Sequence, residues 1–154
     1  MIARRSLILA GAAMAALAPL AARAHPGEID DPTVSPDPLW AMLATTTLSQ
    51  APPDYAYRPS HPPAVLALVG REIQVAGFIA PLEMGREASH FILSRYSPDC
   101  PYCPQGQPNE IIEVRTDRPI RQQSKDLVHL KGRFALQDNG QIGLIFRLAD
   151  AGLA

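Results

Sequence analysis

Proline is the residue that most limits how this chain can fold. The 154-residue sequence contains 16 prolines, and nine of them fall within the 38 residues from 26 to 63. Because proline lacks a backbone N–H and clashes inside a helix, this stretch cannot form long helices or continuous strands. We therefore predict a proline-rich segment over residues 25–63 that contains one or two short helices, followed by a β domain over residues 64–154.

The predicted helices lie at two places in or next to the proline-rich segment. Asp37 can cap a helix that begins at Pro38 and continues to Thr47. A second short helix is predicted over residues 64–69, where two prolines occupy the first turn and a glycine ends it. Residues 51–60, between the two helices, are predicted to be a loop.

From residue 71 onward the apolar residues alternate with polar ones, which is the pattern of half-buried strands. Asp138-Asn139-Gly140 is predicted to form a hairpin turn, and Gly77 is predicted to allow a strong bend in the first strand. The apolar positions of the five predicted strands are Ile73, Val75 and Ile79; Phe91 and Leu93; Ile112 and Val114; Val128, Leu130, Phe134 and Leu136; and Ile142, Leu144, Phe146 and Leu148. Five strands of this length favour a mainly β fold, a small closed barrel of the OB type, with the helices packed outside it.

Residues 1–24 are predicted to be an export signal. Arg4 and Arg5 precede an apolar run over residues 7–20, and alanines near residue 24 suit cleavage before His25. The paired arginines favour the twin-arginine route, and an ordinary secretory signal is the alternative. We therefore expect the protein in the periplasm, without a membrane span once the signal is removed.

The charge balance argues against a nucleic-acid partner. The full chain has a formal net charge of −1. Removal of residues 1–24 takes away three basic residues and leaves 11 basic against 15 acidic side chains, a formal charge of −4. A domain that binds nucleic acid through a basic patch would have the opposite sign.

The tetrapeptide Cys100-Pro101-Tyr102-Cys103 is the constellation with the most specific chemistry. Two cysteines at this spacing can bind one metal ion, cycle between dithiol and disulfide, or form a structural disulfide in an oxidising compartment. The same tetrapeptide occurs in glutaredoxins, where a helix begins at the first cysteine. Here Pro104, Gly106 and Pro108 follow the pair, so a glutaredoxin fold is excluded.

A metal site would need ligands beyond Cys100 and Cys103. His90 is predicted on the outward face of the second strand, and Asp99 directly precedes the cysteines. His25 would contribute an imidazole and a free amino group if it becomes the first residue, a combination that suits copper. We expect Zn or Cu as the metal.

Several other polar and apolar residues are predicted to have no chemical role. Glu110 and Glu113 alternate along a strand and are predicted to form a solvated face. His129 is predicted to be a surface residue, and His61 to belong to a helix start. Leu82 is predicted to be buried in the turn that follows the first strand.

Three stretches together resemble a known family. These are Gly70-Arg-Glu-Ile-Gln-Val-Ala-Gly-Phe-Ile-Ala-Pro-Leu-Glu83, then Phe91-Ile-Leu, then a cysteine loop that ends at Pro108-Asn109. They resemble the bacterial periplasmic domain-of-unknown-function family 3299, over about residues 64–148. The resemblance implies a small exported β domain, often encoded near transport or metal-handling systems, with no established reaction.

The cysteine loop departs from the commoner pattern of that family, which resembles Cys-x-His followed by prolines and an asparagine. Cys100 and Asn109 have the matching spacing, but Tyr102 stands in the histidine position and Cys103 follows it. A second cysteine would preserve two metal ligands, and it would also permit a disulfide. Asp99, Tyr102 and Asn109 are predicted to support the loop.

The prediction for function is a non-enzymatic exported protein that binds or transfers Zn or Cu through Cys100 and Cys103, completed by His90, His25 or a partner. A periplasmic metal-transport or redox protein is the expected partner. The alternatives are a thiol-disulfide exchange partner and an interaction module with a structural disulfide.

Overall fold

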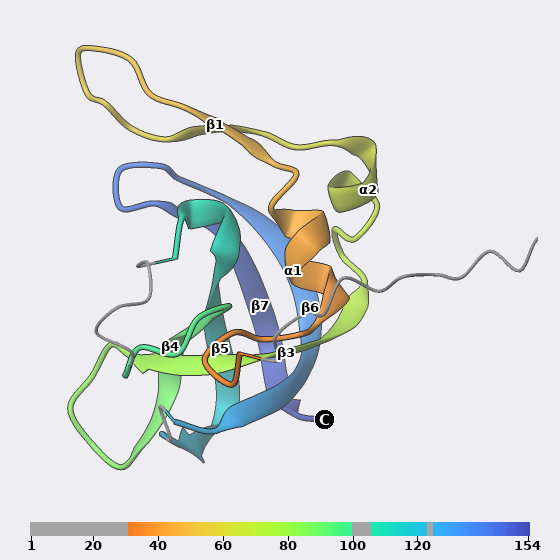
Figure 1. Ribbon diagram of the computed structural model, residues 1–154, viewed down its shortest axis with the longest axis vertical. Coiled ribbons are helices and arrows are strands. Elements are labelled where there is room, and N and C mark those ends of the chain that lie inside the picture. Colours follow the sequence, from red (N-terminus) through yellow and green to blue (C-terminus); the bar gives the residue numbers. More distant parts are fainter. Residues whose placement is uncertain (1–30, 100–105, 123–124) are drawn as a thin grey trace, which may run out of the picture.

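The computed structural model describes residues 31–99, 106–122 and 125–154. Within these residues, no helix has the length and apolar character that crossing a membrane requires. Figure 1 shows a β-barrel with a long hairpin and two short helices at one end.

Five strands close into the barrel. They are β3 (Glu72–Pro81), β4 (Glu87–Ser94), β5 (Ile111–Arg121), β6 (Leu127–Asn139) and β7 (Leu144–Leu153). Their order around the barrel is β3-β4-β5-β7-β6, with β6 pairing back to β3. All neighbours are antiparallel except β5 and β7, which are parallel. This is the strand order of an OB barrel, so the predicted mainly β fold is confirmed.

Two short helices precede the barrel, as predicted, but both are shorter than the sequence suggested. Helix α1 covers Pro38–Leu43, with the Asp37 side chain accepting a hydrogen bond from the Leu39 N–H, and α2 covers Pro63–Leu66. Thr47 lies beyond α1, in β1.

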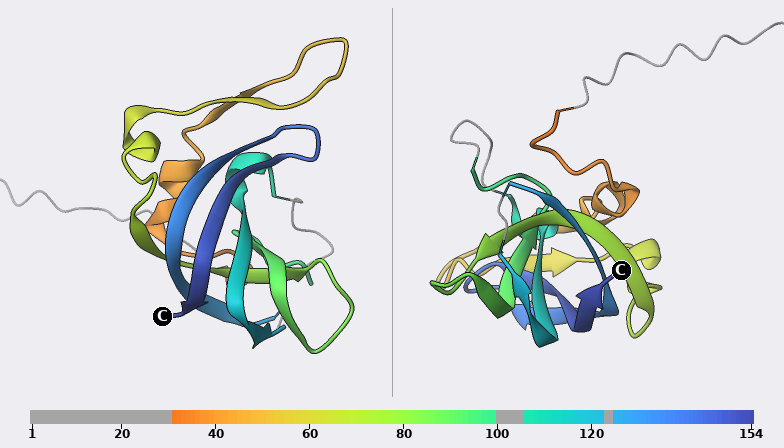
Figure 2. Two further views of the ribbon diagram at one scale, coloured as in Figure 1. Left: turned by 180° about the vertical axis from the view of Figure 1, so that it is seen from behind. Right: turned by 90° about the horizontal axis from the view of Figure 1, so that it is seen from below.

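The segment between the helices contains a hairpin that the sequence did not reveal. Strand β1 (Thr47–Ser49) pairs with β2 (Arg58–Ser60), so the predicted loop over residues 51–60 is wrong at its C-terminal end. The hairpin lies beside the β6–β7 turn, as both views show (Figures 1 and 2), and Tyr57 N donates to Gly140 O at 2.9 Å. Three-residue strands carry too few alternating positions for a period of two to be detected.

The β6–β7 turn also lies later in the chain than predicted. Strand β6 continues to Asn139, and the connection spans residues 140–143, where Gly143 has a φ of +73°. Ile142 is therefore in the turn and is 66% exposed, rather than a strand residue. Leu82, predicted to be buried, is 50% exposed in the β3–β4 connection.

The core fills the barrel and continues into the helices. Trp40 and Leu43 of α1 and Val65 of α2 are fully buried against it. The fully buried core residues contributed by the strands include Phe91, Leu93, Ile112, Val114, Leu130, Phe134, Phe146 and Leu148. The helices thus close one end of the barrel, which is the reason that apolar residues recur in an otherwise proline-rich segment.

Three residues between Ser35 and Trp40 form hydrogen bonds to one backbone position of the barrel, Ala76 of β3. The Ser35 hydroxyl and the Trp40 indole N–H both donate to Ala76 O at 2.7 Å, and the Asp37 carboxylate accepts from Ala76 N at 2.7 Å. Val34 also forms an isolated bridge with Tyr96, just after β4. Residues 31–43 are therefore part of the folded domain.

Gly77, where the sequence predicts a bend, permits the close approach of β3 and β4. A Cβ atom at this position would lie 2.8 Å from both Leu93 Cγ and Ser94 O. A backbone oxygen cannot move aside cheaply, so Gly77→Ala is expected to lower the free energy of unfolding by about 2 kcal/mol, measured by urea denaturation. Gly152→Ala is the matched control, because a Cβ there meets nothing within 4 Å. Equal effects of the two substitutions would contradict this explanation.

Candidate functional site

A polar network spans four strands on the outside of the barrel. Its centre is Glu113 of β5, which alternates with the core residues Ile112 and Val114 and therefore points outward. Glu113 is nevertheless only 4% exposed. Its partners come from β4, β5 and β7, so the network depends on the pairing of β5 with both of its neighbours.

Three side chains donate to or pair with the Glu113 carboxylate. His90 Nε2 lies 2.8 Å from Oε1, Arg115 Nη2 lies 3.1 Å from Oε1, and Arg147 Nε lies 2.9 Å from Oε2. Gln137 of β6 extends the network, because its side-chain oxygen accepts from Arg147. The strand pairing explains this meeting: Glu113 is the register partner of Arg147 in the parallel β5–β7 pair.

Glu113 is ionised over the whole physiological pH range. Burial by itself favours the neutral acid, but the hydrogen bonds from Arg147 and His90 outweigh it and lower the pKa of Glu113 from 4.5 to about 2. The network is thus a buried carboxylate with partly exposed cationic partners.

The ionised carboxylate determines the tautomer of His90. A carboxylate has only acceptor atoms, so the Nε2 of His90 must carry the hydrogen that bridges to Glu113. In the neutral imidazole, Nδ1 then has a free lone pair, and no described residue donates to it. Histidines that bind metals usually have this arrangement, with the second nitrogen donating to a carboxylate.

The described flank of the cysteine loop lies on the same outer face as His90. A Cβ on Gly106 would lie 3.0 Å from Ile111 Cγ2 and 3.6 Å from Ser94 Oγ, so Gly106 sits over this pair of β4 and β5 residues. His90 and Ser94 share a face of β4 and are four residues apart, about 13 Å along the strand.

The other predicted site residues have different positions. Asn109 Nδ2 donates to Ala44 O at 3.2 Å and to Thr46 O at 3.0 Å, which ties the 3₁₀ turn η1 (Pro108–Glu110) to the end of α1. Asp99 is exposed at the N-terminal flank of the loop. His25, Cys100, Tyr102 and Cys103 lie outside the described residues.

No group of three or more histidine, cysteine, aspartate or glutamate residues is arranged to hold a metal within residues 31–99, 106–122 and 125–154. His129 is exposed. His61 Nδ1 lies 3.2 Å from Thr46 Oγ1, its ring packs 5.6 Å from Phe146, and burial lowers the pKa of His61. Neither histidine lies in the polar network.

The predicted solvated face at Glu110 and Glu113 is wrong for both residues. Glu113 is buried in the network, and Glu110 accepts from the Tyr96 hydroxyl at 2.9 Å and pairs with Arg95 at 3.2 Å. The sequence signal that was missed is the apolar neighbourhood of Glu113, which follows Ile111 and Ile112 and precedes Val114. Its main partner, Arg147, lies 34 residues away and cannot be located by local spacing.

Comparison with known proteins agrees with this architecture. The model of DUF3299, described as a protein of unknown function, matches residues 25–143. Among curated proteins no match is found. A crystal structure of a DUF3299 family protein from Pseudomonas aeruginosa PAO1 is 21% identical, with a TM-score of 0.52 over 71% of this chain and 88% of that one. That likeness shows the fold, and the match over most of the sequence shows that the chain belongs to the DUF3299 family.

Proposed function

We propose that this protein is exported to the periplasm and, without catalysing a reaction, binds or transfers Zn or Cu through Cys100, Cys103 and His90. The observation that carries the proposal is the hydrogen bond from His90 Nε2 to the buried Glu113 carboxylate. This bond leaves the lone pair of Nδ1 free to bind a metal ion. Two thiolates and an imidazole suit Zn(II) and Cu(I).

The covalent chain allows Cys103 to approach the strand face that carries His90. Cys103 precedes Gly106 by three residues, so its Cα can lie up to about 10 Å from Gly106. Gly106 lies over Ser94, on the strand face that also carries His90. His25 is a further ligand under this proposal, provided that export ends with cleavage after Ala24.

An incomplete ligand shell suits transfer. Two cysteines and one histidine leave a fourth position open on a tetrahedral ion. A periplasmic metal-transport or redox protein could supply the fourth ligand and then take the ion.

The test is elemental analysis combined with thiol titration on protein purified from the periplasm. We expect about one Zn or Cu per chain and two thiols that become reactive only after a chelator is added. Cys100→Ser should remove the metal. His90→Gln should weaken metal affinity tenfold or more, whereas His129→Gln, the same change at an exposed histidine outside the network, should leave it unchanged.

Two results would overturn this proposal. One is protein without stoichiometric metal whose thiols are released only by a reductant. The other is equal metal affinity in the His90→Gln and His129→Gln variants. In the first case, the reduction potential of the Cys100–Cys103 pair distinguishes thiol exchange from a structural disulfide. A value below about −300 mV is typical of a structural disulfide, and a higher value favours thiol exchange.

A further inference from the structure

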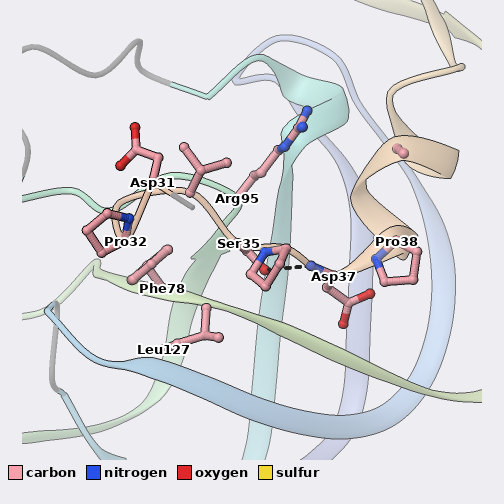
Figure 3. Close-up of a pocket in the computed structure, with 11 residues that line it drawn as sticks. Asp31, Pro32, Ser35, Asp37, Pro38, Phe78, Arg95 and Leu127 are labelled. Carbon is pink, nitrogen blue, oxygen red and sulfur yellow. Dashed lines mark hydrogen bonds between the residues drawn. The ribbon is translucent and has the colours of Figure 1, made fainter. Parts of the chain in front are cut away.

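A cavity of about 610 Å³ lies between the chain before α1 and the barrel, away from the polar network. One wall is formed by residues 31, 32 and 34–38 together with Ala41, and the other by Phe78 of β3, Arg95 after β4, and Leu127 of β6. Figure 3 shows Phe78 and Leu127 on the barrel side, facing the proline-rich wall. This volume is in the range of cavities that hold small organic ligands.

The proline-rich wall offers few hydrogen-bond donors. Proline has no backbone N–H, and three prolines line the cavity: Pro32, Pro36 and Pro38. The proline rings and the Leu127 side chain provide an apolar surface, and Phe78, which is only 2% exposed, lies beneath it. The proline carbonyl groups can only accept.

Four of the remaining donors on this wall are already used. Val34 N donates to Asp31 O, Ser35 N to Arg95 O, and Asp37 N to Ser35 Oγ, the bond drawn in Figure 3. The Ser35 hydroxyl donates to the backbone of β3. A ligand in the cavity must therefore bring its own donors to the wall.

The charges around the cavity favour a cationic ligand. Asp31 and Asp37 both line it, and hydrogen bonds from Thr33 lower the pKa of Asp31, so this exposed carboxyl stays ionised. Arg95 is the cation among the described lining residues, and its charge is balanced by Glu110 at 3.2 Å. Its guanidinium extends away from Phe78 and Leu127 (Figure 3).

We infer that this cavity binds a small organic cation, with an apolar body against Leu127 and the prolines and an ammonium group that donates to Asp31 and Asp37. Asp31 and Asp37 already accept hydrogen bonds from the chain, but an apolar body alone would leave their negative charges without a cation, and an anion would be repelled by them. The inference is independent of the metal proposal, because it uses no residue of the cysteine loop or of the Glu113 network.

The test uses two probes of similar size and opposite charge, phenethylammonium and 3-phenylpropionate, titrated into the purified protein by calorimetry. We expect saturable binding of the ammonium and at least tenfold weaker binding of the carboxylate. Phenethylammonium without saturable binding, or equal affinities of the two probes, would overturn the inference.

Two variants locate the binding in the cavity. Ala41→Phe adds a ring at an exposed position of α1 on the cavity wall and should weaken phenethylammonium binding about tenfold. Asp31→Asn should weaken it about threefold. Asp117→Asn, which removes the same charge at an exposed position of β5 outside the cavity, should have no effect. Undiminished binding in Ala41→Phe, or equal effects of the two aspartate changes, would place the probe elsewhere.

Discussion

Replacing Glu113 with glutamine is expected to lower the free energy of unfolding by about 2 to 3 kcal/mol at pH 7. The substitution keeps the size of the side chain but removes the negative charge that His90, Arg115 and Arg147 share. Glu113 is almost fully buried, whereas its partners reach solvent, so the lost hydrogen bonds contribute more to the loss than stranded charge does. Urea denaturation at fixed pH measures the change.

The same carboxyl predicts how stability depends on pH. Because the pKa of Glu113 is about 2 in the folded protein and near 4.5 when unperturbed, the unfolded chain binds the proton first as the pH falls. The contribution of Glu113 is therefore fully present above pH 4.5 and is lost progressively as the pH falls toward 2. Wild-type protein should lose stability across this window, and Glu113→Gln should lose less.

Glu87→Gln is the matched control, since Glu87 is an exposed residue of β4 outside the network. This variant should keep both the stability and the acid dependence of the wild type. A Glu113→Gln protein with wild-type stability at pH 7, or with an unchanged slope between pH 4.5 and pH 2, would show that the network does not hold the barrel strands together.

Replacing Trp40 with alanine is expected to cost about 4 kcal/mol, the larger of these two effects. The indole is fully buried at the end of the barrel, and its N–H donates to Ala76 O at 2.7 Å. The substitution creates a large cavity beneath α1 and removes one of the bonds that tie residues 31–43 to β3. Calorimetric or urea unfolding of the variant measures the loss.

Two further substitutions separate the parts of this effect. Trp40→Phe keeps much of the apolar volume and loses the donor, and because Ser35 still donates to Ala76 O it should cost only about 1 to 2 kcal/mol. Met42→Ala, on the more exposed side of α1, should change stability by less than about 0.5 kcal/mol. A Trp40→Ala variant no less stable than Met42→Ala would mean that α1 is dispensable for the fold.

Local sequence patterns were sufficient where structure depends on neighbours in the chain. The alternation after residue 71 predicted five barrel strands, and Asp37 with Pro38 predicted the start of α1. The prediction that His90 shares the outward face of β4 follows from the same period of two, because Phe91 is fully buried. The end of α1 and the position of the β6–β7 turn were wrong, since both depend on packing against other segments.

The sequence by itself determined the class of fold, the presence of the short helices and the outward position of His90. These features depend on hydrophobic periodicity and on prolines, whose effects on the backbone extend over only a few neighbouring residues. Only the tertiary structure decided that Glu113 is buried and ionised. Its partner Arg147 reaches it through the parallel pairing of β5 and β7, two strands that the whole of β6 separates in the sequence. The cavity beside Asp31 arises in the same way, since its two walls come from the chain before α1 and from β3, β6 and the end of β4. Contacts between segments this far apart are set by closure of the barrel, and no local pattern of residues records them.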